Sequence, residues 1–251
     1  MSGHSKWKTI QHKKGAADAK RGKIFSKLSK ELSVAARAGG SDPEKNATLR
    51  TVMQKAKSAN MPADNIERAV KKGAGELGGV QYEEIVYEGY ATGGIGLVVL
   101  CLTDNKNRSG AEIRHIFTKQ GTGFAAQGSV SRNFERKGQI FVKADSVNED
   151  TLMDTVLEAG AEDMRRDGEM FEIVTDPSAF SEVMEALEKN GIATEGGEVS
   201  LLPTVTVPVQ DAATAASILK FIGELEDHDD VQSVYANMDI DDAVLKEIED
   251  A

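Results

Sequence analysis

The feature that most limits the possible folds is a glycine-rich stretch at 73–79, where the hydrophobic periodicity of the chain changes. Over about 16–38, apolar residues recur every three or four positions, which is the spacing of one face of an α-helix. After the glycines, 82–90 and 94–103 read as strands. The sequence therefore predicts a helical domain that a linker joins to an α+β body. The apolar stripe of the first helix consists of Ile24, Phe25, Leu28, Leu32, Ala35 and Ala36.

The helical domain is expected to contain three helices. Gly39 and Gly40 end the first, and Ser41 with Glu44 has the spacing of a capping box for the second. Pro62 is a typical first residue for a short third helix, which the glycines at 73–79 close. Few large apolar residues are present, so the core of this domain should be thin.

The body alternates short strands with helices, which favours two α+β domains of the ferredoxin-like sandwich type, with helices on one face of a mainly antiparallel sheet. Ser109 with Glu112 predicts the start of a helix. The group at 204–236 is expected to return and complete the sheet begun at Tyr82, so one α+β domain is inserted in the other. Further strands are expected at 130–134, 139–142, 170–174 and 199–202, and further helices at 149–159, 178–190 and 211–225. The predicted limits are 1–78 for the helical domain, 79–129 plus 204–240 for the discontinuous domain, 130–203 for the inserted domain, and 241–251 for a C-terminal tail.

Charge is distributed unevenly along the chain. Residues 1–75 contain 17 Lys and Arg against 6 Asp and Glu, whereas the other 176 residues contain 13 against 35, and the net charge is −11. A basic domain on an acidic body is the electrostatic pattern of polyanion binding. A basic face that is merely solvated is the alternative.

The predicted nucleic-acid contacts lie on an extended basic arm at 1–15 and on the polar face of the first helix. Trp7 either stacks on a base or fills the helical core. The predicted contact residues are Lys6, Trp7, Lys8, Lys13, Lys14, Lys20, Arg21, Lys23, Lys27, Lys30 and Arg37. Residues 104–137 carry a local excess of 7 basic over 3 acidic side chains. This excess predicts a second contact with nucleic acid, through Lys106, Arg108, Arg114 and Lys119. The alternative is that the excess arose by chance.

No group of residues has the spacing of a catalytic, metal or cofactor site. The four histidines stand far apart, and the lone Cys101 lies in an apolar run where a buried thiol is expected. The acidic cluster at 226–230 lacks the spacing of a calcium loop, so a solvated loop is favoured over an ion site. The glycines at 121–128 favour a flexible loop. We therefore expect a non-enzymatic protein without cofactor, and, since neither a secretory signal nor a membrane span is recognisable, a cytoplasmic one.

Six motifs in this order resemble the YebC/PmpR family over essentially the whole chain. They are GHSKWKTIQHKK at 3–14, NMPADNIERAVKKG at 60–73, YEGY at 87–90, LTDNKNRS at 102–109, GSV at 128–130 and LEDHDDVQSVYANMDI at 225–240. Two loops depart from the family pattern, ATGG at 91–94 and TGFAAQ at 122–127.

The resemblance implies three domains, with the middle one discontinuous, and a bacterial or organellar regulator of gene expression. Members of the family are DNA-binding transcriptional regulators or ribosome-associated translation factors. DNA is the favoured partner, and RNA or the ribosome is the alternative. A protein-interaction module without nucleic-acid binding is the second alternative, and the oligomeric state stays open.

Overall fold

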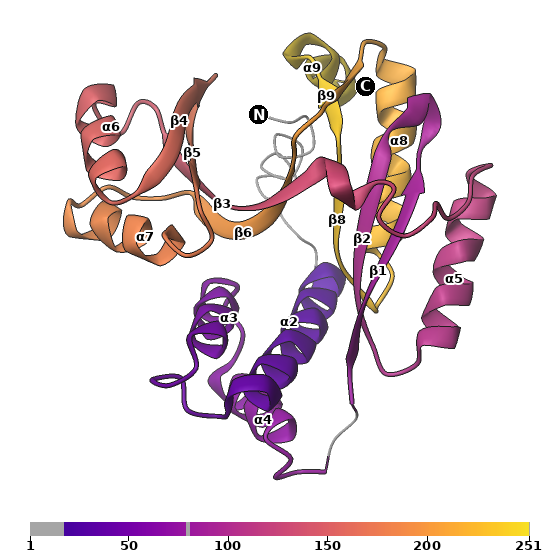
Figure 1. Ribbon diagram of the computed structural model, residues 1–251, viewed down its shortest axis with the longest axis horizontal. Helices are drawn as coiled ribbons and strands as arrows, with labels where there is room; N and C mark the ends of the chain where they lie inside the picture. The colour runs from indigo at the N-terminus through magenta and orange to yellow at the C-terminus, as the bar shows by residue number, and fades with distance from the viewer. Residues whose placement is uncertain (1–17, 79–80, 251) are drawn as a thin grey trace.

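The computed structural model describes residues 18–78 and 81–250, and it shows a helical N-terminal part followed by two separate sheets with helices packed on them (Figure 1). This arrangement confirms the predicted α+β multidomain fold. Within the described ranges, no helix combines the length and apolar character that crossing a membrane requires.

The N-terminal part contains three helices, α2 (Asp18–Gly39), α3 (Ala47–Ser58) and α4 (Ala63–Gly73). Leu32 of α2 and Leu49 of α3 are completely buried between them, and Ile66 of α4 joins the same core. The helices α2 and α4 approach closely at Gly73, where a Cβ atom would lie 2.2 Å from the backbone oxygen of Ser33. Only a glycine permits this approach, which fixes the end of α4 against α2.

The expected capping box does not start the second helix. Instead, Asn46 caps α3, because its side-chain oxygen accepts a hydrogen bond of 3.0 Å from the Leu49 N–H. The Asn46 amide also donates to the Ala35 carbonyl at 2.8 Å. A single buried asparagine therefore ties the end of α2 to the start of α3, whereas Ser41 and Glu44 lie exposed before the helix.

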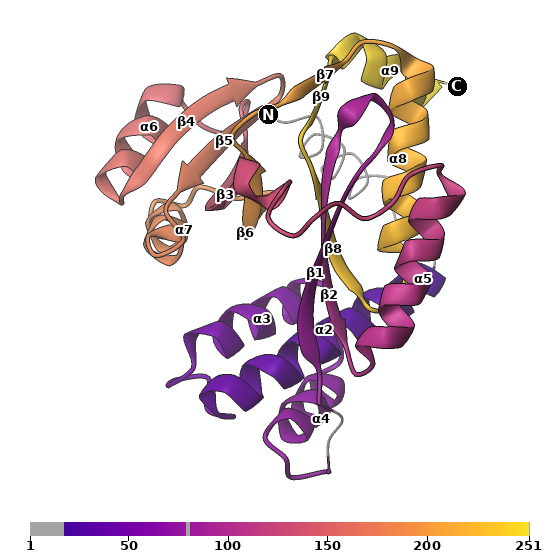
Figure 2. The same cartoon turned by 45° about the vertical axis from the view of Figure 1, so that its right-hand side comes forward.

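The first sheet is antiparallel with the order β1-β2-β8, and two helices cover one of its faces (Figure 2). Alternate residues of β2, such as Leu97 and Val99, face these helices, whereas Val98 points to the opposite face. The β1–β2 turn is built on Gly93 and Gly94, whose φ angles are 78° and 77°. The elements are β1 (Glu83–Tyr90), β2 (Gly96–Thr103), α5 (Lys106–Lys119), α8 (Ala212–Glu226) and β8 (Val231–Ala236).

The second sheet has the order β4-β5-β3-β6 and the β-α-β-β-α-β connection of a ferredoxin-like sandwich. The strand β4 was not predicted. It is an edge strand in which Met164 is the buried residue, so its sequence AEDMRRD lacks an apolar alternation. The predicted strand at 130–134 is instead a 3₁₀ turn, η2 (Ser131–Asn133), before β3 begins. The elements are β3 (Phe134–Lys143), α6 (Glu149–Glu158), β4 (Ala161–Asp167), β5 (Met170–Thr175), α7 (Phe180–Lys189) and β6 (Gly196–Pro203).

The C-terminal elements correct two expectations. The strand β7 (Val207–Val209) does not complete the first sheet but pairs in parallel with β9 (Met238–Ile240). Pro208 lacks an N–H, so a central place in a sheet would lose a ladder hydrogen bond there. The predicted tail is helix α9 (Asp242–Asp250), because Val244 and Leu245 pack into the core of the first sheet.

The second sheet lies within the sequence of the first, since β8 pairs with β2 after the chain has passed through β3 to β6. The outgoing and returning segments lie side by side, and the Thr204 N–H donates to the Asn133 carbonyl at 2.8 Å. The exact domain limits stay predictions.

Candidate nucleic-acid interface

Three lysines of α2, Lys23, Lys27 and Lys30, face the body of the protein. They contact residues 226–230, here called the acidic loop, which connects α8 to β8. The Lys23 Nζ lies 3.0 Å from Asp227 Oδ1, and the Lys27 Nζ donates to the Glu226 carbonyl at 2.7 Å. Figure 2 shows α2 passing beneath the lower end of β8, which brings this helix to the loop. Lys23, Lys27 and Lys30 of the predicted cationic face thus form a contact between domains, called the docking contact below.

Lys27 lies at the centre of the docking contact. Burial lowers its pKa from the ordinary value, although the carboxylates of Glu226 and Asp227 act in the opposite direction. Its ammonium group is largely removed from solvent and donates instead to the acidic loop. The oxygens of this loop therefore face lysines, and within residues 18–78 and 81–250 no three His, Cys, Asp or Glu side chains gather as metal ligands.

Asp230 ends the acidic loop and is 4% exposed. Its Oδ1 lies 2.6 Å from Lys30 Nζ. Its Oδ2 accepts hydrogen bonds from Arg108 Nη2 at 2.7 Å and from the Ser109 hydroxyl at 2.6 Å, with Thr103 Oγ1 at 3.2 Å. Burial alone would raise the pKa of Asp230, but the hydrogen bonds from Lys30, Ser109 and Arg108 outweigh it and hold the pKa well below the ordinary value. The carboxylate is therefore ionised and joins α2 to the body.

The start of α5 supplies two of these donors. The helix begins directly after Asn105, whose side chain caps it by accepting the Arg108 N–H at 3.1 Å. The predicted cap at Ser109 with Glu112 is wrong, because the helix starts one turn earlier. Ser109 therefore lies in the first turn, where the positive end of the helix dipole faces the Asp230 carboxylate.

We predict that Lys23→Glu with Lys27→Glu separates the helical domain from the body. The apolar stripe of α2 stays intact, but two carboxylates then face the acidic loop. A hydrogen bond to a charged group contributes about 1.5–3 kcal/mol, so removal of the Lys27 bond alone shifts the docking equilibrium about tenfold or more. Small-angle scattering should report a larger radius of gyration. The matched control is Lys45→Glu with Lys71→Glu, two exposed positions with the same change in net charge, and its radius of gyration should equal that of the wild type. Equal radii of gyration for the two double variants would contradict the prediction.

The second predicted basic contact is largely engaged within the chain. Arg108 binds Asp230, and the guanidinium of Arg114 lies 5.1 Å from the centre of the Phe124 ring. The Lys119 Nζ is 3.3 Å from a carboxylate oxygen of Glu224. Lys106 is exposed. The local excess of positive charge therefore serves partly to hold α5 in place.

A buried glutamate anchors the end of the glycine loop at 121–128. The carboxylate of Glu88 accepts hydrogen bonds from the backbone N–H groups of Gly128 and Val130, both at 2.7 Å, and of Ser131 at 3.0 Å. Burial alone would raise the pKa of Glu88, but the N–H donors of Ser131, Gly128 and Val130 lower it overall. One end of the loop that was expected to be flexible is thus fixed by a charge.

Comparisons with known proteins fit this architecture. Residues 5–76 match the TACO1/YebC protein N-terminal domain, and residues 82–238 match the TACO1/YebC second and third domain. The chain belongs to the TACO1/YebC family. A probable transcriptional regulatory protein of Geobacter sulfurreducens is 54% identical over 240 residues, which is 96% of either chain. Another from Clostridium novyi is 56% identical over 238 residues, 94% of this chain and 96% of its own.

A solved structure has the same fold. The crystal structure of a conserved hypothetical protein from Aquifex aeolicus is 50% identical and superposes with a TM-score of 0.80, covering 90% of this chain and 93% of its own. The predicted family resemblance is therefore confirmed.

In this TACO1/YebC protein, two pairs of the recognised motifs meet in space. The motifs at 102–109 and 225–240 meet at Asp230, which binds Arg108 and Ser109. The motifs at 87–90 and 128–130 meet at Glu88. These motif residues hold elements together.

Among the described residues of the helical domain, five exposed cations lack a carboxylate partner, as do the half-buried Lys27 and Lys72. The five exposed cations are Arg21, Arg37, Arg50, Lys57 and Arg68. The sequence predicted Arg21 and Arg37 as contacts but not Arg50, Lys57 and Arg68. These three lie on α3 and α4, whereas the prediction relied on the basic arm and on the repeated lysines of α2. The predicted contacts Lys6, Trp7, Lys8, Lys13 and Lys14, and the side chain of Lys20, lie outside the described residues.

Proposed function

We propose that this protein is a non-enzymatic, nucleic-acid-binding regulator of gene expression, with DNA as the favoured partner. Its helical domain and basic arm make the phosphate contacts. The relatives named probable transcriptional regulatory proteins support a regulatory role. A cytoplasmic location follows from this role.

The observation that carries the proposal is the set of unpaired cations on the helical domain. Some exposed lysines of the body do have carboxylate neighbours, such as Lys143 with Glu195 and Lys189 with Glu185. Arg50 and Lys57 are seven residues apart on α3 and share one face of that helix. Cations whose charge no carboxylate neutralises can replace the counterions of a phosphate backbone. The proposal therefore places the interface on α3 and α4 as well as on the arm.

The docking contact changes how the proposal is tested. Reversing the charge of Lys23, Lys27 and Lys30 would release the helical domain as well as remove phosphate contacts, so a loss of binding would have two explanations. Cations outside the docking contact give a cleaner result.

We expect Arg50→Gln, Lys57→Gln and Arg68→Gln together to weaken binding and to reduce its salt dependence. Each phosphate that is no longer neutralised should lower the slope of log affinity against log salt by about 0.9 on duplex DNA and by about 0.7 on a single strand. Fluorescence anisotropy in increasing KCl measures both quantities. The matched control is Lys143→Gln, Arg166→Gln and Lys189→Gln on the inserted domain, with the same change in net charge. Equal slopes for the two variants would place the phosphate-binding residues elsewhere.

The same titration separates the alternatives. Tighter binding of RNA than of duplex DNA at equal salt, with sedimentation on ribosomes that nuclease treatment abolishes, would favour a translation factor. Failure of the intact protein to bind either polymer at moderate salt would leave a protein-interaction module.

A further inference from the structure

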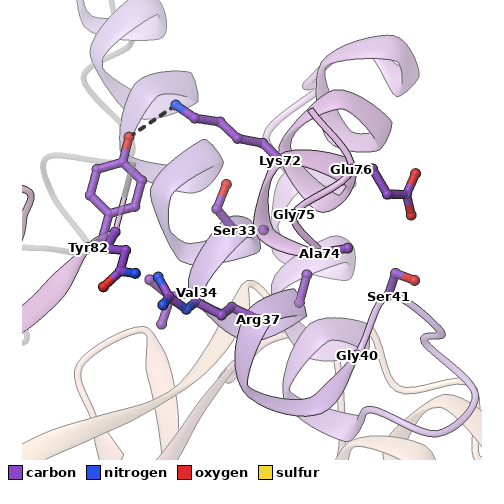
Figure 3. A pocket seen from close by; sticks show the side chains of 13 residues that line it. Ser33, Val34, Arg37, Gly40, Ser41, Lys72, Ala74, Gly75, Glu76 and Tyr82 are labelled. Atoms are coloured by element: carbon purple, nitrogen blue, oxygen red, sulfur yellow. Dashed lines mark hydrogen bonds between the residues drawn. The ribbon is translucent and has the colours of Figure 1, made fainter. Parts of the chain in front are cut away.

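A pocket of about 630 Å³ lies where the C-terminal half of α2 meets the end of α4 and the segment that leads into β1 (Figure 3). Its size is that of a site for a small molecule or a single nucleotide. The polar side chains that line it are Ser33, Arg37, Ser41, Lys72, Glu76, Gln81 and Tyr82.

The floor of the pocket is closely packed. The close approach of Gly73 to the Ser33 backbone leaves no room for a side chain, and the Ser33 hydroxyl donates to the Ala69 carbonyl at 2.9 Å. Two helices are thereby locked together directly beside Lys72. This close packing presents Lys72 to the pocket from a fixed backbone position.

The pocket is electropositive. Within the described residues neither Arg37 nor Lys72 has a carboxylate partner, and the Lys72 Nζ meets the Tyr82 hydroxyl at 3.5 Å, a long hydrogen bond. The ammonium groups of Lys30 and Lys72 lie 5.9 and 5.6 Å from the centre of the Tyr82 ring. In Figure 3, Arg37 extends toward the side that Tyr82 occupies, whereas Glu76, the one carboxylate among the lining residues, points to the other side.

We propose that this pocket binds one unpaired nucleotide, with its phosphate between Arg37 and Lys72 and its base beside Tyr82. The proposal rests on the nucleic-acid-binding function proposed above and specifies the form of nucleic acid. Arginine and lysine together are suited to a phosphate. Tyr82 offers the aromatic surface on which bases pack, and Val34 and Ala36 leave a small apolar wall. A base held in a duplex stack cannot enter a concave site, so a single strand is selected.

The test compares two double variants with the same loss of charge in the full-length protein. Arg37→Gln with Lys72→Gln removes the pocket cations, and Arg50→Gln with Lys57→Gln removes cations outside it. The probes are a labelled single-stranded hexauridylate and a labelled duplex DNA. The pocket variant should lose about a hundredfold or more in affinity for the single strand, as two charge-assisted hydrogen bonds contribute, and about threefold or less for the duplex. The control variant should weaken both probes by similar factors.

If the pocket variant and the control weaken both probes equally, the pocket proposal is overturned while the general function stands. If the intact protein binds neither probe, the proposed function fails, and a second measurement decides about the pocket. Uridine monophosphate is then titrated while the amide NMR signals of Gly73, Gly75 and Tyr82 are followed. Shifts confined to these signals, and absent from the pocket variant, support the pocket; no shift at millimolar nucleotide overturns it.

Discussion

Replacing Asp230 with alanine is expected to lower the free energy of unfolding by about 3 to 5 kcal/mol, the effect of breaking a buried ion pair from one side. The carboxylate is 4% exposed and satisfies donors from α2 and from the first turn of α5. Without it, the Lys30 ammonium, whose side chain is 13% exposed, stays at the domain junction with one fewer acceptor. The Ser109 hydroxyl loses its acceptor there as well, although it keeps a bond to the Asn105 carbonyl.

Urea denaturation followed by circular dichroism measures this decrease in stability. Asp229→Ala is the matched control, because Asp229 is exposed and contributes its backbone carbonyl to Lys30. Its unfolding free energy should change little. If the unfolding free energy of Asp230→Ala changes equally little, water replaces the carboxylate without cost, and the domain junction does not depend on Asp230.

Asp230 also predicts a pH dependence. Its pKa is lower in the folded protein than the ordinary value of 3.8, so its stabilising contribution is complete above that value and is lost as the pH falls below it towards the folded pKa. The wild type should therefore lose stability between about pH 5 and the acid limit more steeply than Asp230→Asn, which cannot titrate at this position. Parallel curves for the two proteins would contradict the assignment.

Replacing Glu88 with alanine is expected to cost about 3 kcal/mol or more, because three backbone N–H groups lose their acceptor and each buried, unsatisfied group costs about 1–3 kcal/mol. The effect should concentrate where the chain leaves the first sheet. Amide hydrogen exchange at Val130 and Ser131 should accelerate strongly, whereas exchange in α3 should not change.

Glu88→Gln is the informative comparison. The side-chain oxygen of the glutamine still accepts from some of the backbone N–H groups. Its NH2 group is itself a donor and cannot accept from the others, so the decrease in stability should be intermediate. Unchanged exchange at Val130 in both variants would mean that the 3₁₀ turn is held by packing alone.

Local patterns predicted much of the fold. The apolar stripe of α2 predicted that helix within two residues of each end, and the alternation after the glycine linker predicted β1 and β2. The failures have local causes as well. The edge strand β4 buries few side chains and so shows no alternation, and the caps of α3 and α5 are Asn46 and Asn105, where serine had been expected.

The candidate site was less predictable, because its partners are distant in sequence. Lys23 and Asp227 are separated by 204 positions, and no periodicity reports such a pair. Lys23, Lys27 and Lys30 of α2 were predicted to face phosphates, and in this structure they face the oxygens of the acidic loop. The pocket likewise combines residues from α2, α4 and the segment before β1, so Lys72 and Tyr82 acquire their relation only after the helices have packed.

The paired passage into and out of the inserted domain has a mechanical consequence. The Thr204 N–H donates to the Asn133 carbonyl directly beside the β3–β6 pairing, and two connected segments resist torsion more than a single segment would. A small apolar cluster of Val98, Val130, Phe134 and Tyr235 packs at this junction. Rotation of the inserted domain about a single connecting segment is therefore prevented, because two segments and this cluster hold it to the first sheet.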